Sequence, residues 1–491
     1  METTSNKKVT IKRKRVKIER DVSRVITRLH IPENIIRIKH IVDRISPLPE
    51  EESERLYAEI VHRFSERHRD LENIFLEHYN EILNYTKISK RISDLKKRLI
   101  GAYFTMEYSI ESAAIFNPSI IKHPNQSNLL DGECRFIMSL RATGEGHISS
   151  VVFRSGIIDK SSSVIFDPIS EYVSTPHIVH DRFYDSHLFK IKLNEIGAWD
   201  NTSKEILKHI PEKFSFQELR NVINSLYSKL SFANKDKTIN IMYWIANSNY
   251  FKMFNADSNL SERVIFPVSE HEIGGIEDAR FVEFCNDSGE STYYATYTAY
   301  NGTHILPHLL ETTDFLNFNI VTLNGEAAKN KGMALFPRKI NGKYAMLSRV
   351  DGENNFIMFS DNIHFWNEAI EIQRPKYPWE FIQIGNCGSP IETDEGWLVL
   401  THGVGAVRQY SISAILLDLE DPTKVIKSLK EPLLSPNEAE REGYVPNVVY
   451  SCGSMIHGEN LFIPYAMSDV TSGIATVNVK DLIDNMEPEP H

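Results

Sequence analysis

Two adjacent carboxylates and an arginine stand together in the range 275–282, which reads Gly-Ile-Glu-Asp-Ala-Arg-Phe-Val and leads into an aromatic-rich strand pattern. The entry to a strand has a tightly fixed backbone, so a carboxylate there can be held against a substrate. Glu277 and Asp278 compete for ionisation, and one of them can stay protonated near neutral pH and act as a general acid. An isolated Glu-Asp-x-Arg is more often a surface ion pair, so this pattern gains its weight from the rest of the chain.

Similar polar turns follow other strand patterns along the chain. Arginine, lysine and histidine in such turns suit an anion, whereas aspartate and asparagine suit sugar hydroxyls. Taken singly, Arg338 or Lys339 is better explained as a solvated charge, and His402 as a hydrogen-bonded core histidine. Because the turns recur at equivalent positions, we expect them to gather at one mouth of the fold. They are residues 116–119, 139–143, 277–280, 331, 338–339, 348–351, 388–392, 401–403 and 465–469.

The elements that would position these turns form a repeat. Each copy has a turn, a short alternating strand, a glycine-containing hairpin turn such as Asn341-Gly342, and an aromatic or apolar strand. A spacing of roughly 50 to 65 residues fits propeller blades of four strands, although a sandwich of hairpins would have the same period. We therefore predict a mainly β fold, a five-bladed β-propeller. The copies begin at Gly275, Phe336, Gly388 and Gly453, with a weaker fifth at Asp131.

The first hundred residues have a different character. Residues 7–20 carry eight Lys or Arg, and we interpret this basic arm as an edge strand that pairs with a partner subunit rather than as a nucleic-acid contact. Apolar residues then recur at helical spacing, which predicts packed helices. The predicted domains are a helical extension at 1–108, a propeller at 109–480 with a partly helical insertion at 155–263 between its first and second blades, and a tail at 481–491. The apolar stripes are Leu56, Ile60 and Phe64, then Leu71, Phe75 and Tyr79.

Composition narrows the classes of function. The 491 residues carry a net charge of -11, which argues against a general nucleic-acid binder, and no apolar run approaches a membrane span. No apolar segment follows the N-terminal charges, so we expect no secretory signal. The four cysteines are scattered without a CxxC pair, which predicts neither zinc nor disulfides and favours the cytoplasm. The helical extension favours a homo-oligomer.

Several long motifs, in the same order, resemble glycoside hydrolase family 130. The resemblance covers roughly residues 109–480 and implies a five-bladed propeller that acts on β-mannosides. Many members are inverting phosphorylases that release mannose 1-phosphate, and others are β-1,2-mannosidases. The motifs are Asn117-Pro118 with Arg141, Gly275-Ile276-Glu277-Asp278-x-Arg280, Phe336-Pro337-x-Lys339-Ile340-Asn341-Gly342-Lys343-Tyr344, Gly388-Ser389-Pro390-Ile391-x-Thr393, Gly396-Trp397, His402-Gly403 and Leu416-Leu417-Asp418-Leu419-x-Asp421-Pro422.

The resemblance also implies roles for individual residues. Asp278 would be the general acid, its proton passing through a hydroxyl of the bound mannosyl group, and Arg280 would orient the acid pair. The expected substrate-binding residues are Asn117, Arg141, Glu277, Arg280, Asp351 and Asp469. The expected phosphate-binding residues are Lys331, Lys339, Arg349, His402, Arg408 and Tyr410. Phosphate, a co-substrate, brings its own negative charge, so inversion needs no protein base, and we expect no metal or cofactor.

Two positions depart from the family pattern. Ala279 replaces a common proline, at little chemical cost, whereas Glu392 stands where phosphorylases often have lysine. A carboxylate there would repel phosphate and could activate water instead, which makes a β-1,2-mannosidase with Glu392 as base the alternative. The retained cations favour phosphorolysis of a manno-oligosaccharide. A propeller that binds glycans without cleaving them is a third reading, and Asp278 discriminates against it because such a module needs no poised acid.

Overall fold

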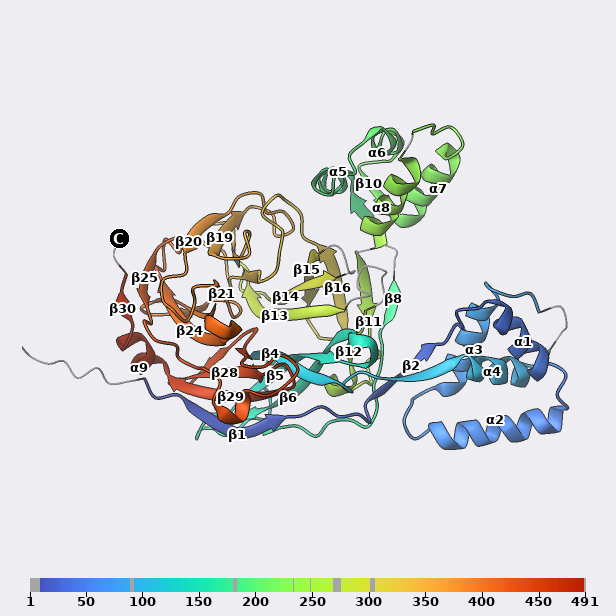
Figure 1. Cartoon of the computed structure of the whole chain (residues 1–491), viewed down its shortest axis with the longest axis horizontal. Helices are drawn as coiled ribbons and strands as arrows, with labels where there is room; N and C mark the ends of the chain where they lie inside the picture. The colour runs from blue at the N-terminus through green and yellow to red at the C-terminus, as the bar shows by residue number, and fades with distance from the viewer. Residues whose placement is uncertain are drawn as a thin grey trace, which may run out of the picture.

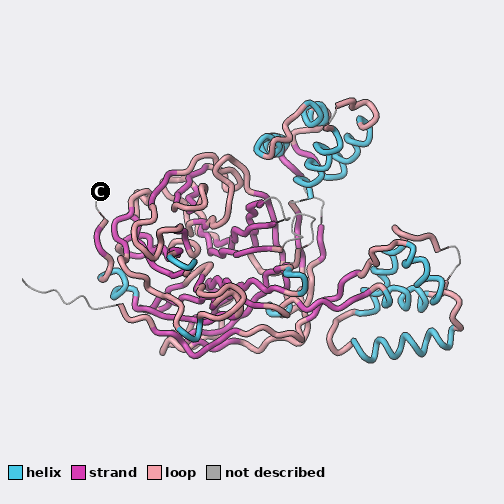
Figure 2. The backbone as a smooth tube through the Cα atoms, viewed as in Figure 1, coloured by secondary structure: helices cyan, strands magenta, loops and turns pink. Residues whose placement is uncertain are grey.

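The computed structural model describes residues 9–88, 92–179, 183–232, 234–247, 249–267, 275–300 and 305–489. They form a mainly β protein with some helices. Most strands belong to five antiparallel sheets that make up one rounded body, and the helices gather chiefly in two lobes beside it (Figures 1 and 2). Within the described residues, no helix is long and apolar enough to cross a membrane.

Each of the five sheets is named here by the strand at its first edge. The β4 sheet contains β4 (Ala114–Lys122), β5 (Cys134–Thr143), β6 (Ser149–Ile158) and β12 (Val264–Ile265), with β7 (Val164–Phe166) beside β6. The β13 sheet contains β13 (Ile276–Cys285), β14 (Ser291–Tyr300), β15 (Ile305–Thr312), β16 (Asn317–Thr322), β11 (Tyr250–Met253) and β8 (His177–Val179). The β17 sheet contains β17 (Ala334–Leu335), β18 (Tyr344–Ser348), β19 (Asn355–Ser360) and β20 (Ile370–Gln373).

The remaining two large sheets complete the body. The β21 sheet contains β21 (Gln383–Asn386), β23 (Gly396–Val404), β24 (Tyr410–Leu417), β25 (Val425–Ser428) and β30 (Glu487–Pro488), with β22 (Ile391–Thr393) beside β23. The β26 sheet contains β26 (Val449–Tyr450), β28 (Asn460–Met467), β29 (Thr471–Asn478) and β1 (Lys12–Ile18), with β27 (Met455–His457) beside β28. All five repeat copies predicted from the sequence fall in different sheets, and their hairpins are present.

Apolar clusters join the sheets in a cyclic order. Each cluster takes its buried side chains mainly from two sheets, because both faces of every sheet carry apolar residues. Residues from two sheets that share a cluster are Phe153 with Phe281 (β4 and β13 sheets), Phe284 with Met346 (β13 and β17), Leu347 with Trp397 (β17 and β21), Leu400 with Ile463 (β21 and β26), and Phe462 with Phe136 (β26 and β4).

Hydrogen bonds between neighbouring sheets follow the same cycle. They are Phe281 N to Ser119 Oγ at 3.2 Å, Cys285 N to Pro337 O at 2.9 Å, Asn386 Nδ2 to Gly332 O at 2.5 Å, Tyr410 N to Asn447 O at 3.0 Å and Cys452 N to Pro118 O at 2.9 Å. The first edges of the five sheets therefore lie toward one another, and β4, β13 and β21 are near the middle of the body in Figure 1.

Both ends of the described chain are built into sheets. β1, the basic arm, pairs antiparallel with β29 of the same chain, from Lys12 opposite Thr476 to Ile18 opposite Ser472. The interpretation of this arm as a strand for a partner subunit is therefore wrong. Glu487 and Pro488, expected in a tail, pair with β25 after the short helix α9 (Val479–Asp484).

The N-terminal helices form one lobe, which joins the body through the ribbon of β2 (Val25–Leu29) and β3 (Thr105–Ser109) (Figure 1). The predicted helices are present, and the stripe on α3 is buried because α3 packs on α4. Arg69 ties the lobe to the body through an ion pair with Glu262 at 3.0 Å. The helices are α1 (Ile36–Ile45), α2 (Glu50–Phe64), α3 (Leu71–Ile82) and α4 (Asp94–Tyr103).

The second helical lobe is narrower than the predicted insertion 155–263. It begins at β9 and ends with α8, whereas β7, β8, β11 and β12, which fall in the predicted range, complete the β4 and β13 sheets. Ser215 caps α7, since its hydroxyl accepts Glu218 N at 3.2 Å. The lobe contains β9 (Phe183–Asp185), α5 (Ser186–Glu195), α6 (Asn201–Leu207), β10 (Lys213–Ser215), α7 (Phe216–Leu226) and α8 (Lys235–Asn247).

Candidate active site

Two β-bulges aim side chains from adjacent sheets at each other. Asn117 interrupts the pairing of β4 with β5, and Asp278 interrupts the pairing of β13 with β14. Both have a positive φ, 48° and 54°, and a bulge of this kind turns its side chain out of the regular alternation. Asn117 Nδ2 donates to Asp278 Oδ1 at 2.6 Å. The motifs at 117 and 278 thus meet in one site.

Cations surround the acidic pair. Arg141 on β5 bonds Glu277 Oε1 at 3.0 Å and lies 3.5 Å from Asp278 Oδ1. Its Nε donates to Ser149 Oγ at 3.0 Å, which fixes the guanidinium. Lys331 pairs with the other oxygen of Glu277. Glu277 is therefore held between two cations, Arg141 and Lys331, next to Asp278.

Arg280 supports the bulge itself. Its Nη1 donates to the backbone carbonyl of Asp278 at 3.2 Å, and its Nη2 donates to the hydroxyl of Tyr450 at 2.7 Å. The side chain is buried, only 2% exposed, so both contacts form away from water. The expected orienting role of Arg280 has a concrete geometry here, through the main chain of Asp278 rather than through its carboxylate.

The carboxyl groups of the site differ in acidity. Burial raises the pKa of Asp278, but Arg141 and Arg280 together with the hydrogen bond from Asn117 outweigh it, so this pKa lies below its usual range. Burial, followed by the negative charge of Asp278, raises the pKa of Asp469 to about 6. The sequence predicts a protonated group within the Glu277–Asp278 pair, whereas the carboxyl whose pKa is raised in the structure is that of Asp469.

A basic group lies next to the acids. A Cβ on Gly332 would come 3.9 Å from Cβ of Arg349, so the loop that carries Lys331 runs directly beside Arg349. Arg408 is exposed in a turn with φ of 54°, and its charge lowers the pKa of Asp469, which places it near the carboxylates. Lys331, Arg349 and Arg408 thus form a cationic group around the acidic pair.

His402 has a different role from the expected cation. Burial, aided by Arg349 and Arg280, holds the pKa of His402 well below its usual range, so the ring is neutral at pH 7. Arg349 Nη1 donates to His402 Nε2 at 3.3 Å, and the ring of Tyr410 stacks on the imidazole at 5.9 Å. His402 therefore orients Arg349, and Tyr410 supports that arrangement. A phosphate-binding role of His402 stays a prediction, and its neutral ring, 2% exposed, would contribute to it through Arg349.

Glu392 and Lys339 lie at the far end of the innermost strands. Cys285 lies seven positions beyond Asp278 on β13, and its backbone N–H donates to the carbonyl of Pro337. Arg338, which follows Pro337, pairs with Glu392 at 2.7 Å. At roughly 3.3 Å per residue this separates Glu392 from Asp278 by about 20 Å. Lys339 reaches Asp287 there at 3.4 Å. The expected base role of Glu392 and phosphate role of Lys339 do not fit this distance from Asp278. The sequence could not tell the two strand ends apart, because polar turns occur at both.

Asp351 lies beyond the end of β18, two residues after Arg349, but its carboxylate is engaged in its own turn. Asp351 Oδ1 accepts the backbone N–H groups of Glu353 at 2.8 Å and Asn354 at 2.9 Å, and the side chain is exposed. A carboxylate used in this way is a turn cap. The structure does not bring Asp351 into the acidic pair.

Two residues of the site were missed in the sequence. Tyr450 bridges the acidic and basic groups. Its hydroxyl accepts a hydrogen bond from Arg280 Nη2, and the centre of its ring lies 4.9 Å from that of His402. The Ser149 hydroxyl accepts a hydrogen bond from Arg141. A Cβ on Gly275 (φ 104°) would come 2.6 Å from Ser149 N, so only glycine allows β13 to enter beside β6. Tyr450 precedes the Gly453 copy of the repeat, and that position was the available signal.

Comparison with known proteins decides the family. Residues 246–488 match the model of a family described as beta-1,4-mannooligosaccharide phosphorylase. The chain is 35% identical over 227 residues to the 1,2-beta-oligomannan phosphorylase of Thermoanaerobacter sp., which spans 45% of this chain and 75% of that protein. The chain belongs to glycoside hydrolase family 130. The resemblance recognised in the motifs is thereby confirmed, and the chain is an enzyme of this family.

Other members of family 130 are similar over comparable stretches. The beta-1,2-mannobiose phosphorylase of Listeria innocua is 31% identical over 233 residues, 46% of this chain and 64% of that protein. The beta-1,4-mannooligosaccharide phosphorylase of Ruminococcus albus is 35% identical over 224 residues, 43% of this chain and 62% of that protein. The solved complex of the Listeria enzyme with beta-1,2-mannobiose superposes with a TM-score of 0.46 at 21% identity, covering 76% of this chain and 92% of that one.

Proposed function

We propose that this family 130 enzyme cleaves β-1,2-linked manno-oligosaccharides by inverting phosphorolysis and releases mannose 1-phosphate. The observation that carries the proposal is the position of Asp278, bonded to Asn117 and flanked by Arg141, beside the cationic group of Lys331, Arg349 and Arg408. An acid next to a cluster of cations suits a reaction in which a phosphate attacks while a leaving oxygen is protonated. The names of the relatives supply the sugar and, in two of them, the linkage.

The chemistry follows from the charges. Asn117, Arg141 and Asp469 would hold the mannosyl unit, and the cationic group would hold phosphate against the opposite face of its anomeric carbon. Phosphate is already a nucleophile, so no protein base is needed. Asp278 would supply the proton for the leaving oxygen through a sugar hydroxyl.

Bound substrates would also retune Asp278. Phosphate adds negative charge beside the cations that hold the pKa of Asp278 down, and sugar displaces water around it. Both changes favour the protonated carboxyl. Asp278 would then become an effective acid only in the complex, which limits wasteful protonation in the empty enzyme.

We further propose that the five sheets are the blades of a five-bladed propeller. The cyclic order of the apolar clusters and of the hydrogen bonds between sheets supports this arrangement, since a sandwich of two sheets has no such cycle. β1 would close the ring by joining the last sheet.

The four cysteines have free thiols, which supports a cytoplasmic location.

Hydrolysis is the competing reaction, and one experiment separates the two. The protein is incubated with β-1,2-mannobiose with and without inorganic phosphate, and mannose 1-phosphate and mannose are quantified. We expect cleavage to require phosphate and to give equal amounts of mannose 1-phosphate and mannose. Release of mannose alone, at the same rate without phosphate, would refute phosphorolysis. β-1,4-mannobiose is the matched control, and preferential cleavage of it would refute the linkage while leaving the reaction intact.

A further inference from the structure

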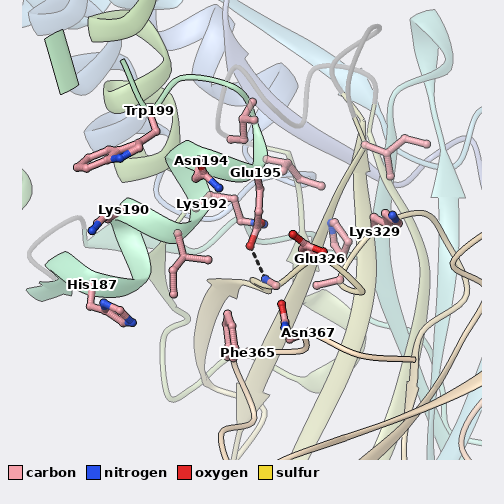
Figure 3. Close-up of a pocket in the computed structure, with 17 residues that line it drawn as sticks. His187, Lys190, Lys192, Asn194, Glu195, Trp199, Glu326, Lys329, Phe365 and Asn367 are labelled. Carbon is pink, nitrogen blue, oxygen red and sulfur yellow. Dashed lines mark hydrogen bonds and ion pairs between the residues drawn. The ribbon is translucent and has the colours of Figure 1, made fainter. Parts of the chain in front are cut away.

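A large cleft separates the second helical lobe from the body. It has a volume of about 930 Å³ and lies between α5 on one side and the rim of the β13 and β17 sheets on the other (Figure 3). Lys190, Asn194 and Trp199 line the lobe side, and Glu326 and Asn367 line the rim. The cleft is open to water, because the side chains of Lys190, Asn194, Glu326 and Asn367 are all exposed.

The lining suits a polyhydroxylated ligand. Asn194 and Asn367 each offer two donors and an acceptor, and Glu326 adds two acceptor oxygens, which matches the mixed donors and acceptors of sugar hydroxyls. Phe365 adds a half-buried ring that can cover the apolar face of a sugar. Aromatic surface with a few polar groups is the usual composition of a small-ligand site.

The charged side chains of the cleft favour an anionic ligand less than its polar side chains favour a neutral sugar. Lys192 is 4% exposed and pairs with Glu195 at 2.6 Å, so this cation is already neutralised. Lys190 lies over the ring of Trp199 at 5.1 Å, and the rim carries one charge of each sign, Glu326 and Lys329. A neutral chain therefore fits better than a phosphate group.

One loop lines both the cleft and the candidate active site. Residues 323–333 connect β16 to β17; they place Glu326 and Lys329 in the wall of the cleft and Lys331 on Glu277. Lys329 and Lys331 are two residues apart, which is at most about 7 Å of chain. A ligand that extends from the acidic pair past Lys331 would meet the wall of the cleft at Lys329.

The helical lobe is fixed to this loop. Glu195 Oε1 accepts the backbone N–H of Gly325 at 2.5 Å. Gly325 has φ of 108°, and a Cβ there would come 1.9 Å from Trp366 O, so the loop packs against the body without room for a side chain. This hydrogen bond links the two walls of the cleft without a ligand, and such a link lowers the entropic cost of ordering them on binding.

From this arrangement we infer that the cleft binds the distal mannosyl units of a manno-oligosaccharide whose terminal unit occupies the site at Asp278. The second helical lobe makes the enzyme selective for chains longer than a disaccharide. This inference rests on the proposed function for the identity of the sugar, but the binding of long chains is measurable without turnover.

Binding to an inactive protein tests the inference directly. In an Asp278→Asn background, the affinity for β-1,2-linked oligosaccharides of two to eight units is measured by calorimetry. We expect affinity to rise about tenfold or more with length, the gain expected from one or two added hydrogen bonds. Asn194→Ala and Asn367→Ala, from opposite walls, should each remove most of that rise and leave the disaccharide unaffected. Glu368→Ala, exposed beside Asn367 but outside the lining, is the matched control.

The outcomes separate this inference from the proposed reaction. Affinity that does not depend on chain length, or a length dependence unchanged in both asparagine variants, overturns the cleft assignment even if mannose 1-phosphate is formed. A length dependence that both variants abolish supports the cleft even if the wild-type protein forms no mannose 1-phosphate, in which case only the proposed reaction fails. Loss of affinity for every length, including the disaccharide, also counts against a separate distal site.

Discussion

Asp278 is a carboxylate whose environment stabilises its ionised form until substrates arrive. Arg141, Arg280 and Asn117 all act on it, and each comes from or supports a different strand of the site. A general acid in such a setting becomes protonated only when bound ligands raise its pKa, whereas an acid in an apolar pocket is protonated without them. The residues around Asp278 therefore matter through its pKa as well as through contacts to sugar.

We expect Asp278→Asn to lower turnover by at least about a hundredfold, because general acid catalysis contributes that much or more. Asparagine keeps an oxygen for the hydrogen bond from Asn117, so sugar affinity and the thermal unfolding midpoint should stay close to those of the parent. The measurement is the rate of mannose 1-phosphate release at saturating substrate. Glu392→Gln, about 20 Å away, is the matched control and should retain most of the activity. Equal losses in the two variants would contradict the assignment of the acid.

The acidity of Asp469 predicts a dependence of stability on pH. Its folded pKa of about 6 lies above the roughly 3.9 of an unfolded aspartate. Between these values the native state binds more protons than the unfolded state, so this group makes the protein less stable as pH rises from about 4 to about 6. Asp469→Asn removes that contribution, and we expect the variant to be more stable than the parent at pH 7 by about 1–2 kcal/mol.

Urea unfolding at pH 4.5, 5.5 and 7 checks the Asp469 prediction. The difference between variant and parent should grow with pH and level off above about pH 6. A difference that is the same at all three pH values would mean that the carboxyl has an ordinary pKa in the folded protein.

At the scale of elements, a buried ion triad joins the N-terminal ribbon to the β4 sheet. Glu111 Oε1 lies 2.8 Å from Arg24 Nε and 2.8 Å from Arg154 Nη2, and all three side chains are at most 3% exposed. Arg24 also donates to Ser261 O at 2.6 Å. Burial makes such charges costly unless all are paired, so the triad specifies where the ribbon leaves the body.

Glu111→Gln should therefore destabilise the protein strongly. The change removes the carboxylate that pairs with both buried arginines, and we expect the free energy of unfolding to fall by about 3–5 kcal/mol. Chemical denaturation at pH 7 gives the value. The exposed Glu171→Gln in the same region is the matched control and should change it by less than about 0.5 kcal/mol. A small effect of Glu111→Gln would mean that water reaches the triad.

At the scale of the whole molecule, the start of the described chain pairs with the last sheet, and two helical lobes lie beside the body of five sheets. β1 joins the last sheet, so removing the N-terminal hundred residues would open that sheet as well as delete the helices. The first lobe has its own apolar core and exposes Ile35 and Ile36, at 56% and 63%. Exposed apolar side chains on an appended lobe favour its expected role in assembling subunits.

We expect a homo-oligomer that depends on this lobe. Leu29 pairs with Thr105, so residues 30–104 can be replaced by Asn-Gly to form a two-residue hairpin turn that keeps β1, β2 and β3. The shortened protein should be monomeric by light scattering and should keep its activity on β-1,2-mannobiose. Ile36→Glu in the full chain should weaken assembly, whereas Ile165→Glu, equally exposed on the body at 60%, should not. An unchanged mass in both lobe variants would contradict the prediction.

Features that depend on neighbours along the chain could be predicted from the residue pattern. Alternating strands with glycine-containing turns predicted the hairpins of the five sheets, four-residue spacing predicted α2 and α3, and the motifs indicated the family. Which polar turns meet depends on tertiary contacts. Asn117 lies 161 residues from Asp278, and Glu392 sits at the opposite strand end although its turn looks equally polar. Burial and neighbouring charge, which set the acidity of Asp469 and the neutrality of His402, exist only once distant strands are packed together.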